Sequence, residues 1–224
     1  MFELRTHNLW RKVLRERNKK IIELCKGKKI LHLGATDRPY TKEQFEKWIL
    51  LHAKITDVSK ETLWLDLDHD AINFLSKKWY DNIIQMDFNK INWLNYKPDV
   101  IVFGETIEHI MNLELFFQNL KKTMTNDTIL IITTPNALCF IIQLLWLFGK
   151  EIVHPDHNII FTLWTIKQLL EKNWLKVVDN YRTFLPKGRY NLFIATGFLV
   201  NKLLSYIFPS LAEDLFIIAK LKIK

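Results

Sequence analysis

The sequence has few of the residues that build disulfides and linkers, and its apolar runs are too short to span a membrane. Its 224 residues include 2 Cys, 6 Gly and 6 Pro. Cys25 and Cys139 match no metal or redox spacing, so a reducing compartment is the simpler interpretation, and we predict a cytoplasmic protein. The longest apolar run, residues 137–148, is shorter than the ~20 residues that a membrane-spanning helix needs. The charged N-terminal segment lacks the apolar stretch of a signal peptide.

Length and composition predict one globular domain over residues 1–224. Apolar residues make up 49% of the chain and charged residues 25%, which is ordinary for a protein with a full core. Within the domain we expect a basic N-terminal helix over residues 1–27. We expect a ligand-binding core over residues 28–135. Residues 136–224 should form helices and late strands on the side of the second ligand.

Positive charge is concentrated at the start of the chain. The net charge is +8, and residues 1–29 hold ten Lys or Arg against three acids. Such an arm can contact nucleic acid, anionic lipid or an acidic substrate. A solvated helix face is the plainer interpretation and the one we favour, because the rest of the chain is nearly neutral. Nucleic acid is therefore not an expected partner.

A strand pattern that ends in a glycine turn is the most informative segment. Residues 29–33 read Lys-Ile-Leu-His-Leu, and Gly34 opens a short polar turn. Glycine lets the backbone turn sharply and leaves room for a ligand. Two later strand patterns end in acids, at Asp66 and Asp87. A strand, a glycine turn, a helix and an acidic strand end in this order are typical of a nucleotide-type site on an open α/β sheet.

Strand and helix patterns alternate as far as residue 135. This alternation predicts a mostly parallel sheet with helices on both faces, and two late strands predict an antiparallel edge. The predicted strands are 29–33, 62–67, 82–86, 98–103, 128–133, 174–184 and 214–221. The predicted helices are an amphipathic N-terminal helix through Leu9, Val13, Ile21 and Leu24, and helices over 41–57, 70–80, 113–124, 137–148, 165–173 and 191–207.

An ordered set of motifs resembles a known family. The motifs are His32-Leu-Gly-Ala-Thr-Asp37, Leu65-Asp66-Leu-Asp68, Asp87, Phe103-Gly-Glu-Thr-Ile-Glu-His109, Thr133-Thr-Pro-Asn136 and His154-Pro-Asp-His157. The set resembles class I S-adenosylmethionine-dependent methyltransferases, and within them the ubiquinone-biosynthesis and surface-glycan O-methyltransferases. The resemblance covers roughly residues 27–184. It implies an α/β, Rossmann-like, doubly wound fold with a mostly parallel seven-stranded sheet and an antiparallel edge strand.

The resemblance also implies S-adenosylmethionine as the cofactor and a role for each matching residue. Asp66 would bind the ribose hydroxyls, and Asp68 is the less favoured ribose ligand. Capping of the next helix is the alternative role of both residues. Glu105 would line the wall near the sulfonium. The implied cofactor-binding residues are Gly34, Ala35, Thr36, Asp37, Asp66, Leu67, Asp87, Phe88, Gly104 and Glu105. The turn after the first predicted strand holds one glycine, Gly34, where family members usually have two or three.

Transfer to a hydroxyl benefits from a nearby base, because a hydroxyl is a poor nucleophile at neutral pH. His109 is the first candidate, and a structural pairing with Glu108 is its alternative role. His157 is the second, so the candidate catalytic residues are His109, His157 and Glu108. His154 and Asp156 are candidate substrate-binding residues. A metal held by His154, Asp156 and His157 is a less favoured alternative, and we assign no metal.

The expected function is methyl transfer to a hydroxyl of a sugar, a glycan or another small acceptor. A nucleic-acid methyltransferase or binding module and a catalytically inactive relative are the alternatives. A nicotinamide dehydrogenase is disfavoured, because no Gly-x-Gly-x-x-Gly follows the first strand. We expect the late apolar segments to form core or a lid, with contact to a lipid-linked acceptor or a membrane as the alternative. The sequence leaves the oligomeric state open.

Overall fold

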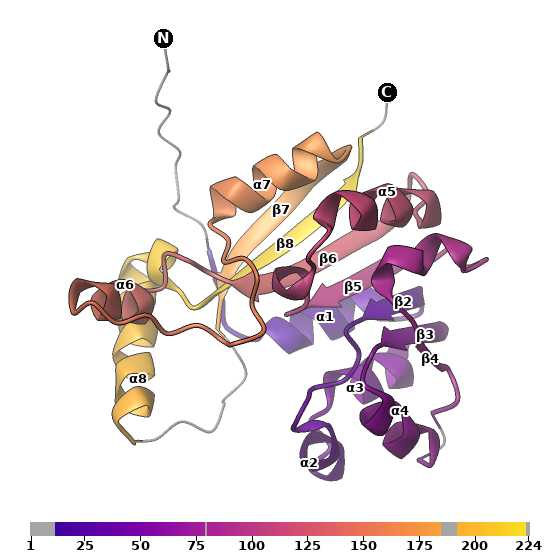
Figure 1. The fold of residues 1–224 in the computed structure, drawn as a ribbon, viewed down its shortest axis with the longest axis horizontal. Helices are drawn as coiled ribbons and strands as arrows, with labels where there is room; N and C mark the ends of the chain where they lie inside the picture. Colours follow the sequence, from indigo (N-terminus) through magenta and orange to yellow (C-terminus); the bar gives the residue numbers. More distant parts are fainter. Residues whose placement is uncertain (1–11, 79, 185–191, 223–224) are drawn as a thin grey trace.

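The structure is a computed structural model that describes residues 12–78, 80–184 and 192–222. The strands are β1 (Val13–Leu14), β2 (Lys29–Leu33), β3 (Glu61–Asp66), β4 (Ile83–Gln85), β5 (Val100–Gly104), β6 (Ile129–Pro135), β7 (Leu175–Thr183) and β8 (Asp214–Leu221). They form one eight-stranded sheet in the order β1-β7-β8-β6-β5-β2-β3-β4 (Figure 1). Neighbouring strands are parallel except at β8, which runs antiparallel to β6 and β7.

Helices cover both faces of this sheet, which confirms the predicted fold class. One face packs against α1 (Arg17–Cys25) and α3 (Leu51–Val58), and the other packs against α5 (Leu113–Thr123) and α7 (Leu163–Lys172). The central strands are apolar on both sides, since alternate residues point to opposite faces and both are buried. The other helices are α2 (Thr41–Glu46), α4 (His69–Ser76), α6 (Phe140–Leu147), α8 (Leu192–Ile207) and the short η1 (Phe88–Trp93), η2 (Ile107–His109) and η3 (Pro209–Leu211).

The sheet differs from the prediction at one side. Val13 and Leu14, which we placed in the N-terminal helix, form a short strand that pairs in parallel with Arg182 and Thr183 of β7. The helix α1 begins only at Arg17, and the predicted helical positions before residue 12 lie outside the described residues. This pairing adds an eighth strand. The antiparallel strand β8 lies between β6 and β7 rather than at the edge.

The predicted helix over residues 41–57 is two helices. The first, α2, ends at Glu46, and α3 begins at Leu51. Trp48 between them has a φ of 57° and is 79% exposed. A residue in the left-handed region ends a helix, because the next turn cannot continue the same hydrogen-bond pattern. The apolar spacing hid this break, since Phe45 and Ile55 still pack inward on either side of it.

The late apolar helices contribute no apolar core residue among their described side chains, so the core half of our expectation is wrong, and a lid stays a prediction. No residue of α6 is buried, and α6 contacts α8 beside the sheet (Figure 1). In the described side chains of α8 the buried residues are the polar Asn201 and Ser205, while Leu199, Leu203 and Ile207 are exposed. No helix in the described part of the chain is long and apolar enough to span a membrane. Contact of this apolar surface with a membrane stays a prediction.

Two histidines are buried against each other beneath the glycine turn. His32 of β2 and His52 of α3 bring their Nδ1 atoms to 2.7 Å, and both rings are almost fully buried. Burial lowers the pKa of His52 to about 3, and burial together with His52 lowers the pKa of His32 well below its ordinary value. Both imidazoles are therefore neutral in the folded protein at neutral pH.

We expect this pair to make the fold sensitive to acid. An unfolded histidine takes up its proton near pH 6.5, whereas His52 does so only near pH 3 in the folded state. The unfolded state thus binds more protons between these values, and stability falls as pH falls from 6.5 towards 3. Urea unfolding should show His52 contributing about 2 kcal/mol to the loss between pH 7.5 and pH 5. His52→Asn should flatten that dependence, and His69→Asn, on the surface of α4, should leave it unchanged. An unaltered slope in His52→Asn would contradict the assignment.

Candidate active site

The predicted glycine turn lies at the carboxyl ends of the parallel strands, which we call the carboxyl edge. Gly34 has a φ of +70°, a backbone conformation that residues other than glycine rarely adopt. A Cβ built at Gly34 would lie 2.0 Å from Oγ1 of Thr106, so the turn also packs too tightly for any larger residue. The amide of Gly34 donates to the Leu65 carbonyl at 3.0 Å, which ties the turn to β3. One glycine is thus enough to form this turn.

Asp66 ends β3 and faces the glycine turn. Its Oδ2 accepts a hydrogen bond from the amide of Thr36 at 2.7 Å, and its Oδ1 accepts from the amides of Leu67 and Asp68 at 2.7 and 2.9 Å. A carboxylate has about four acceptor positions. Three are used by the backbone, which leaves a position on Oδ2 for a ligand. The structure therefore brings Gly34, Thr36 and Asp66 together, as the sequence predicted.

The neighbouring acids have local roles. Asp68 caps α4 by accepting from the amides of Asp70 and Ala71, so the capping alternative holds for Asp68. Asp87 accepts from the amide of Asn89 at the start of η1. Leu67, beside Asp66, is 58% exposed.

Four other predicted residues lie at or behind the same edge. Ala35 is fully buried behind the turn, whereas Asp37 is exposed in it. Gly104, at the end of β5, accepts a hydrogen bond through its carbonyl from the Thr106 hydroxyl at 2.7 Å. Phe88 is buried in the main core and packs edge-on against Phe103. Core packing therefore accounts for the burial of Phe88 without a ligand.

A buried charge network that the sequence did not predict holds α1 onto the carboxyl edge. Nη1 of Arg17 lies 2.7 Å from Oε1 of Glu105 and 2.9 Å from Oδ2 of Asp214. Arg17 is buried, with 8% of its surface exposed, and Asp214 is fully buried. Burial alone would lower the pKa of Arg17, but the two carboxylates raise it above its ordinary value. Arg17 and Asp214 are 197 positions apart, so no spacing rule pairs them.

Glu105 sits in a strained conformation at the end of β5. Its φ is +46°, in the left-handed region that costs a non-glycine residue about 1–2 kcal/mol. Its amide donates to the Thr133 carbonyl at 2.9 Å, and its carboxylate is held by Arg17. Strain of this kind persists where the surroundings fix it and often marks a functional position. Glu105, which we predicted to line the wall near the sulfonium, is therefore held in place through both its backbone and its side chain.

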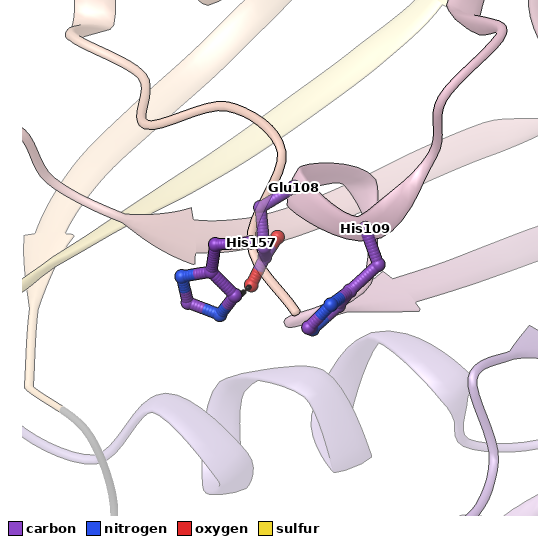
Figure 2. A group of neighbouring side chains, drawn as sticks. All are labelled: Glu108, His109 and His157. Carbon is purple, nitrogen blue, oxygen red and sulfur yellow. Dashed lines mark ion pairs between the residues drawn. The ribbon is translucent and has the colours of Figure 1, made fainter. Parts of the chain in front are cut away.

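The three candidate catalytic residues meet at this edge. Glu108 and His109 lie on η2 just after β5, and His157 reaches them from the loop after α6 (Figure 2). Nε2 of His157 is 3.9 Å from Oε1 of Glu108. One side-chain ligand atom from each residue lies within 4.8 Å of those of the other two. We call these residues the Glu108–His109–His157 cluster.

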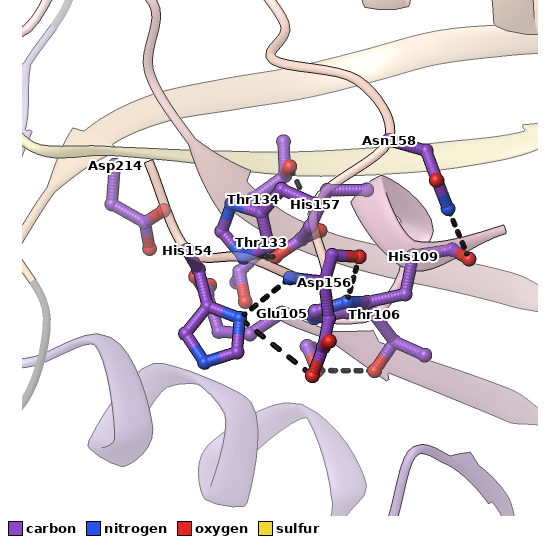
Figure 3. Close-up of polar contacts among 12 residues, drawn as sticks. Glu105, Thr106, His109, Thr133, Thr134, His154, Asp156, His157, Asn158 and Asp214 are labelled. Carbon is purple, nitrogen blue, oxygen red and sulfur yellow. Dashed lines mark hydrogen bonds and ion pairs between the residues drawn. The ribbon is translucent and has the colours of Figure 1, made fainter. Parts of the chain in front are cut away.

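Asn158 fixes the loop that carries His157. Its amide donates to the Glu108 carbonyl at 2.8 Å, and its side-chain nitrogen donates to the His109 carbonyl at 2.9 Å (Figure 3). Nδ1 of His109 is 2.9 Å from the Asp156 carbonyl. A carbonyl only accepts, so His109 donates from Nδ1, and in the neutral ring Nε2 is then the acceptor atom. The sequence did not single out Asn158, although it directly follows the His-x-x-His motif.

Burial shifts the protonation of two cluster members. Burial raises the pKa of Glu108 well above its ordinary value, and Glu105 adds to this shift. Burial, followed by the neighbouring His109 and His154, lowers the pKa of His157 to about 4. His157 is thus neutral at pH 7 and presents a lone pair. A neutral imidazole of this kind can accept a hydrogen bond or bind a metal ion.

The two candidate substrate-binding residues border the cluster. His154 and Asp156 are both mostly exposed, and Nδ1 of His154 accepts from the Asp156 amide at 3.3 Å (Figure 3). The His154 ring centroid lies 5.2 Å from that of His157. They therefore form an open polar rim rather than part of the buried interior.

The sequence matches the model of a known protein family. The model described as a methyltransferase domain matches residues 5–180. This range contains the glycine turn, Asp66 and the whole cluster, and Asp214 lies outside it. No curated protein sequence matches the chain.

Solved structures with the same fold include methyltransferases. A SAM-dependent methyltransferase from Archaeoglobus fulgidus is 18% identical, covers 91% of each chain and gives a TM-score of 0.58. An S-adenosylmethionine-dependent methyltransferase from Clostridium acetobutylicum is 12% identical and covers 92% of this chain and 91% of that one, with a TM-score of 0.60. A structure described as a complex of DhpI with SAH is 9% identical and covers 93% and 83% of the two chains, with a TM-score of 0.54.

Proposed function

Because this chain belongs to the methyltransferase domain family, we propose that it transfers a methyl group from S-adenosylmethionine to a hydroxyl of a sugar, a glycan or another small acceptor. The observation that carries the proposal is the position of the Glu108–His109–His157 cluster. Glu108 and His109 follow β5 at the same edge of the sheet as the Gly34 turn and Asp66, and His157 reaches them from the loop after α6. A donor held by the turn and an acceptor held by the cluster would meet across the end of β5.

The residues at the edge fit the cofactor. The free acceptor position on Asp66 suits a ribose hydroxyl, and the exposed Leu67 beside it suits one face of a purine. The Gly34 turn brings backbone close to the ligand without a side chain between them. The cofactor, when bound, supplies a methyl group on a sulfonium that is already activated for displacement. The protein then has mainly to align the two partners and exclude water.

The cluster suits a hydroxyl acceptor in particular. In the neutral ring of His109, Nε2 has the lone pair, because Nδ1 donates to the Asp156 carbonyl. A neutral imidazole placed there can take up the proton that a hydroxyl loses when it is methylated. The exposed polar rim of His154 and Asp156 favours an acceptor that carries several hydroxyl groups over an apolar one. These features support a sugar-like acceptor.

Labelled S-adenosylmethionine and a panel of sugars, nucleotide sugars, catechols and amines test this proposal. We expect label to enter a hydroxyl compound, and His109→Ala to lower kcat by about 100-fold because the proton acceptor is lost. The affinity for S-adenosylmethionine should stay within about threefold, since His109 does not contact Asp66 or Gly34. His69→Ala, on the surface of α4, is the matched histidine control and should keep its activity. Transfer to amines alone, or full turnover by His109→Ala, would contradict the proposal.

A further inference from the structure

Three ligating side chains of the cluster surround one point at the carboxyl edge. Glu108, His109 and His157 each offer one ligand atom, and these atoms lie within 4.8 Å of one another (Figure 2). Ligand atoms bound to one small divalent ion lie roughly 3 Å apart, since each is about 2 Å from the ion. Closing this difference requires the rings of His109 and His157, which are only partly buried, to turn towards Glu108.

A buried oxygen without a hydrogen bond points into this group. Glu108 is 1% exposed, and the Thr134 hydroxyl donates to its Oε2 at 3.0 Å. Its Oε1 has no hydrogen-bond partner among the described residues and lies 3.9 Å from Nε2 of His157. An unpartnered buried carboxylate oxygen is costly, because it has left water without a replacement. A bound cation would supply that missing partner.

The surrounding residues orient the ligands as they do around metal ions. The Asp156 carbonyl accepts from Nδ1 of His109, which fixes the ring and leaves Nε2 as the ligand atom. Thr134 holds the second carboxylate oxygen, and Asn158 fixes the loop opposite η2 (Figure 3). These contacts therefore hold Glu108, His109 and the loop of His157 close to one another.

We propose that Glu108, His109 and His157 bind a divalent cation, and that oxygens of the acceptor occupy its open coordination positions. This inference rests on the proposed function and identifies how the hydroxyl is activated. Two imidazoles and one carboxylate with open positions suit Mn²⁺, Fe²⁺ or Zn²⁺ better than an all-oxygen ion such as Ca²⁺. Two adjacent hydroxyls of an acceptor would fill two positions, so the preferred acceptor is a vicinal diol. His154 and Asp156 stay outside the ligand set.

The cation would lower the pKa of the acceptor hydroxyl by withdrawing electron density from its oxygen. The methyl carbon then forms a bond to that oxygen as its bond to sulfur breaks. The sulfur keeps the electron pair of the broken bond. With the cation bound, Nε2 of His109 would be a ligand, so the cation would replace His109 as the group that activates the hydroxyl, and the hydroxyl proton would pass to water. The products are the methyl ether, S-adenosylhomocysteine and a proton, so charge and atoms balance without an oxidant or reductant.

Titration with Co²⁺, followed by visible absorption and calorimetry, tests the site without any turnover. We expect one Co²⁺ per chain, and Mn²⁺ should displace it. Glu108→Gln and His157→Asn should each weaken Co²⁺ binding by at least about 100-fold, because each removes a ligand. His154→Asn, which changes a nearby histidine outside the ligand set, should keep the affinity within about threefold. His157 lies on a partly exposed loop, so His157→Asn remains informative even if Glu108→Gln unfolds.

The same samples are titrated with S-adenosylmethionine, so that the two proposals fail separately. Binding of S-adenosylmethionine without binding of Co²⁺ would overturn the cation site and leave the methyltransferase proposal standing. Equal Co²⁺ affinity in the wild type and His157→Asn would also overturn it. Loss of Co²⁺ binding in His154→Asn alone would move the site to the exposed rim and contradict a ligand set of Glu108, His109 and His157.

Discussion

Asp66→Ala is expected to weaken S-adenosylmethionine binding by about 10- to 100-fold in a calorimetric titration. A hydrogen bond to a charged carboxylate contributes about 1.5–3 kcal/mol, and tenfold in affinity corresponds to about 1.4 kcal/mol. The same carboxylate accepts from the amides of Thr36, Leu67 and Asp68, so its loss also loosens the turn that holds the ligand. Both effects act in the same direction on affinity.

Asp68→Ala is the matched control for this experiment. Asp68 caps α4 through the amides of Asp70 and Ala71, so its loss should cost about 1 kcal/mol of stability and leave affinity near that of the wild type. Asp66→Asn keeps one acceptor oxygen for the backbone and removes the charge, which separates binding from folding. An equal loss of affinity in Asp66→Ala and Asp68→Ala would contradict the role assigned to Asp66.

Arg17→Met is expected to lower the free energy of unfolding by about 3–5 kcal/mol, measured by urea denaturation at pH 7. The substitution removes the cation that faces Glu105 and Asp214, and Asp214 is fully buried. Removing one partner of a buried ion pair leaves an uncompensated charge, which costs more than the pair itself contributes. Burial already raises the pKa of Asp214 well above its ordinary value, and Glu105 adds to this while Arg17 opposes it. Without Arg17 the pKa of Asp214 should rise further.

Two further variants test whether the buried charge causes this loss. Lys19→Met, on the exposed side of the same helix, breaks only a surface pair with Glu16 and should cost less than about 1 kcal/mol. Adding Asp214→Asn to Arg17→Met should recover part of the lost stability, because the buried charge is then removed. A double variant less stable than Arg17→Met would show that Asp214 stabilises the fold by some means other than pairing with Arg17.

The strands that carry the site could be predicted from the sequence, because their signals are local. The apolar run that ends before Gly34 marks the end of β2, and Asp66 marks the end of β3. Because the two strands are parallel, these ends lie at the same edge of the sheet. Glu108 and His109 are adjacent in the chain, so their placement followed from that of β5. His157 came from a separate motif, and only the fold shows that it faces Glu108.

The parts that could not be predicted depend on contacts between distant segments. Arg17 was one of ten basic residues in a charged arm, and nothing local distinguished it from the exposed Lys19. Val13 and Leu14 have an apolar pattern too short to separate a strand from a helix, and their pairing with β7 decides it. Hydrophobicity could not predict which side of α8 is buried. Its polar Asn201 and Ser205 are buried, whereas polar side chains are usually exposed.

The proposed activity depends on the carboxyl edge between the Gly34 turn and Asp66 binding the nucleoside of S-adenosylmethionine. A crystal structure of the protein grown with S-adenosylhomocysteine tests this binding site by direct observation. We expect a ribose hydroxyl within hydrogen-bond distance of Oδ2 of Asp66 and the sulfur facing the end of β5 towards Glu105. Density for the nucleoside at any other surface of the sheet, with that edge left to solvent, would refute the proposed site.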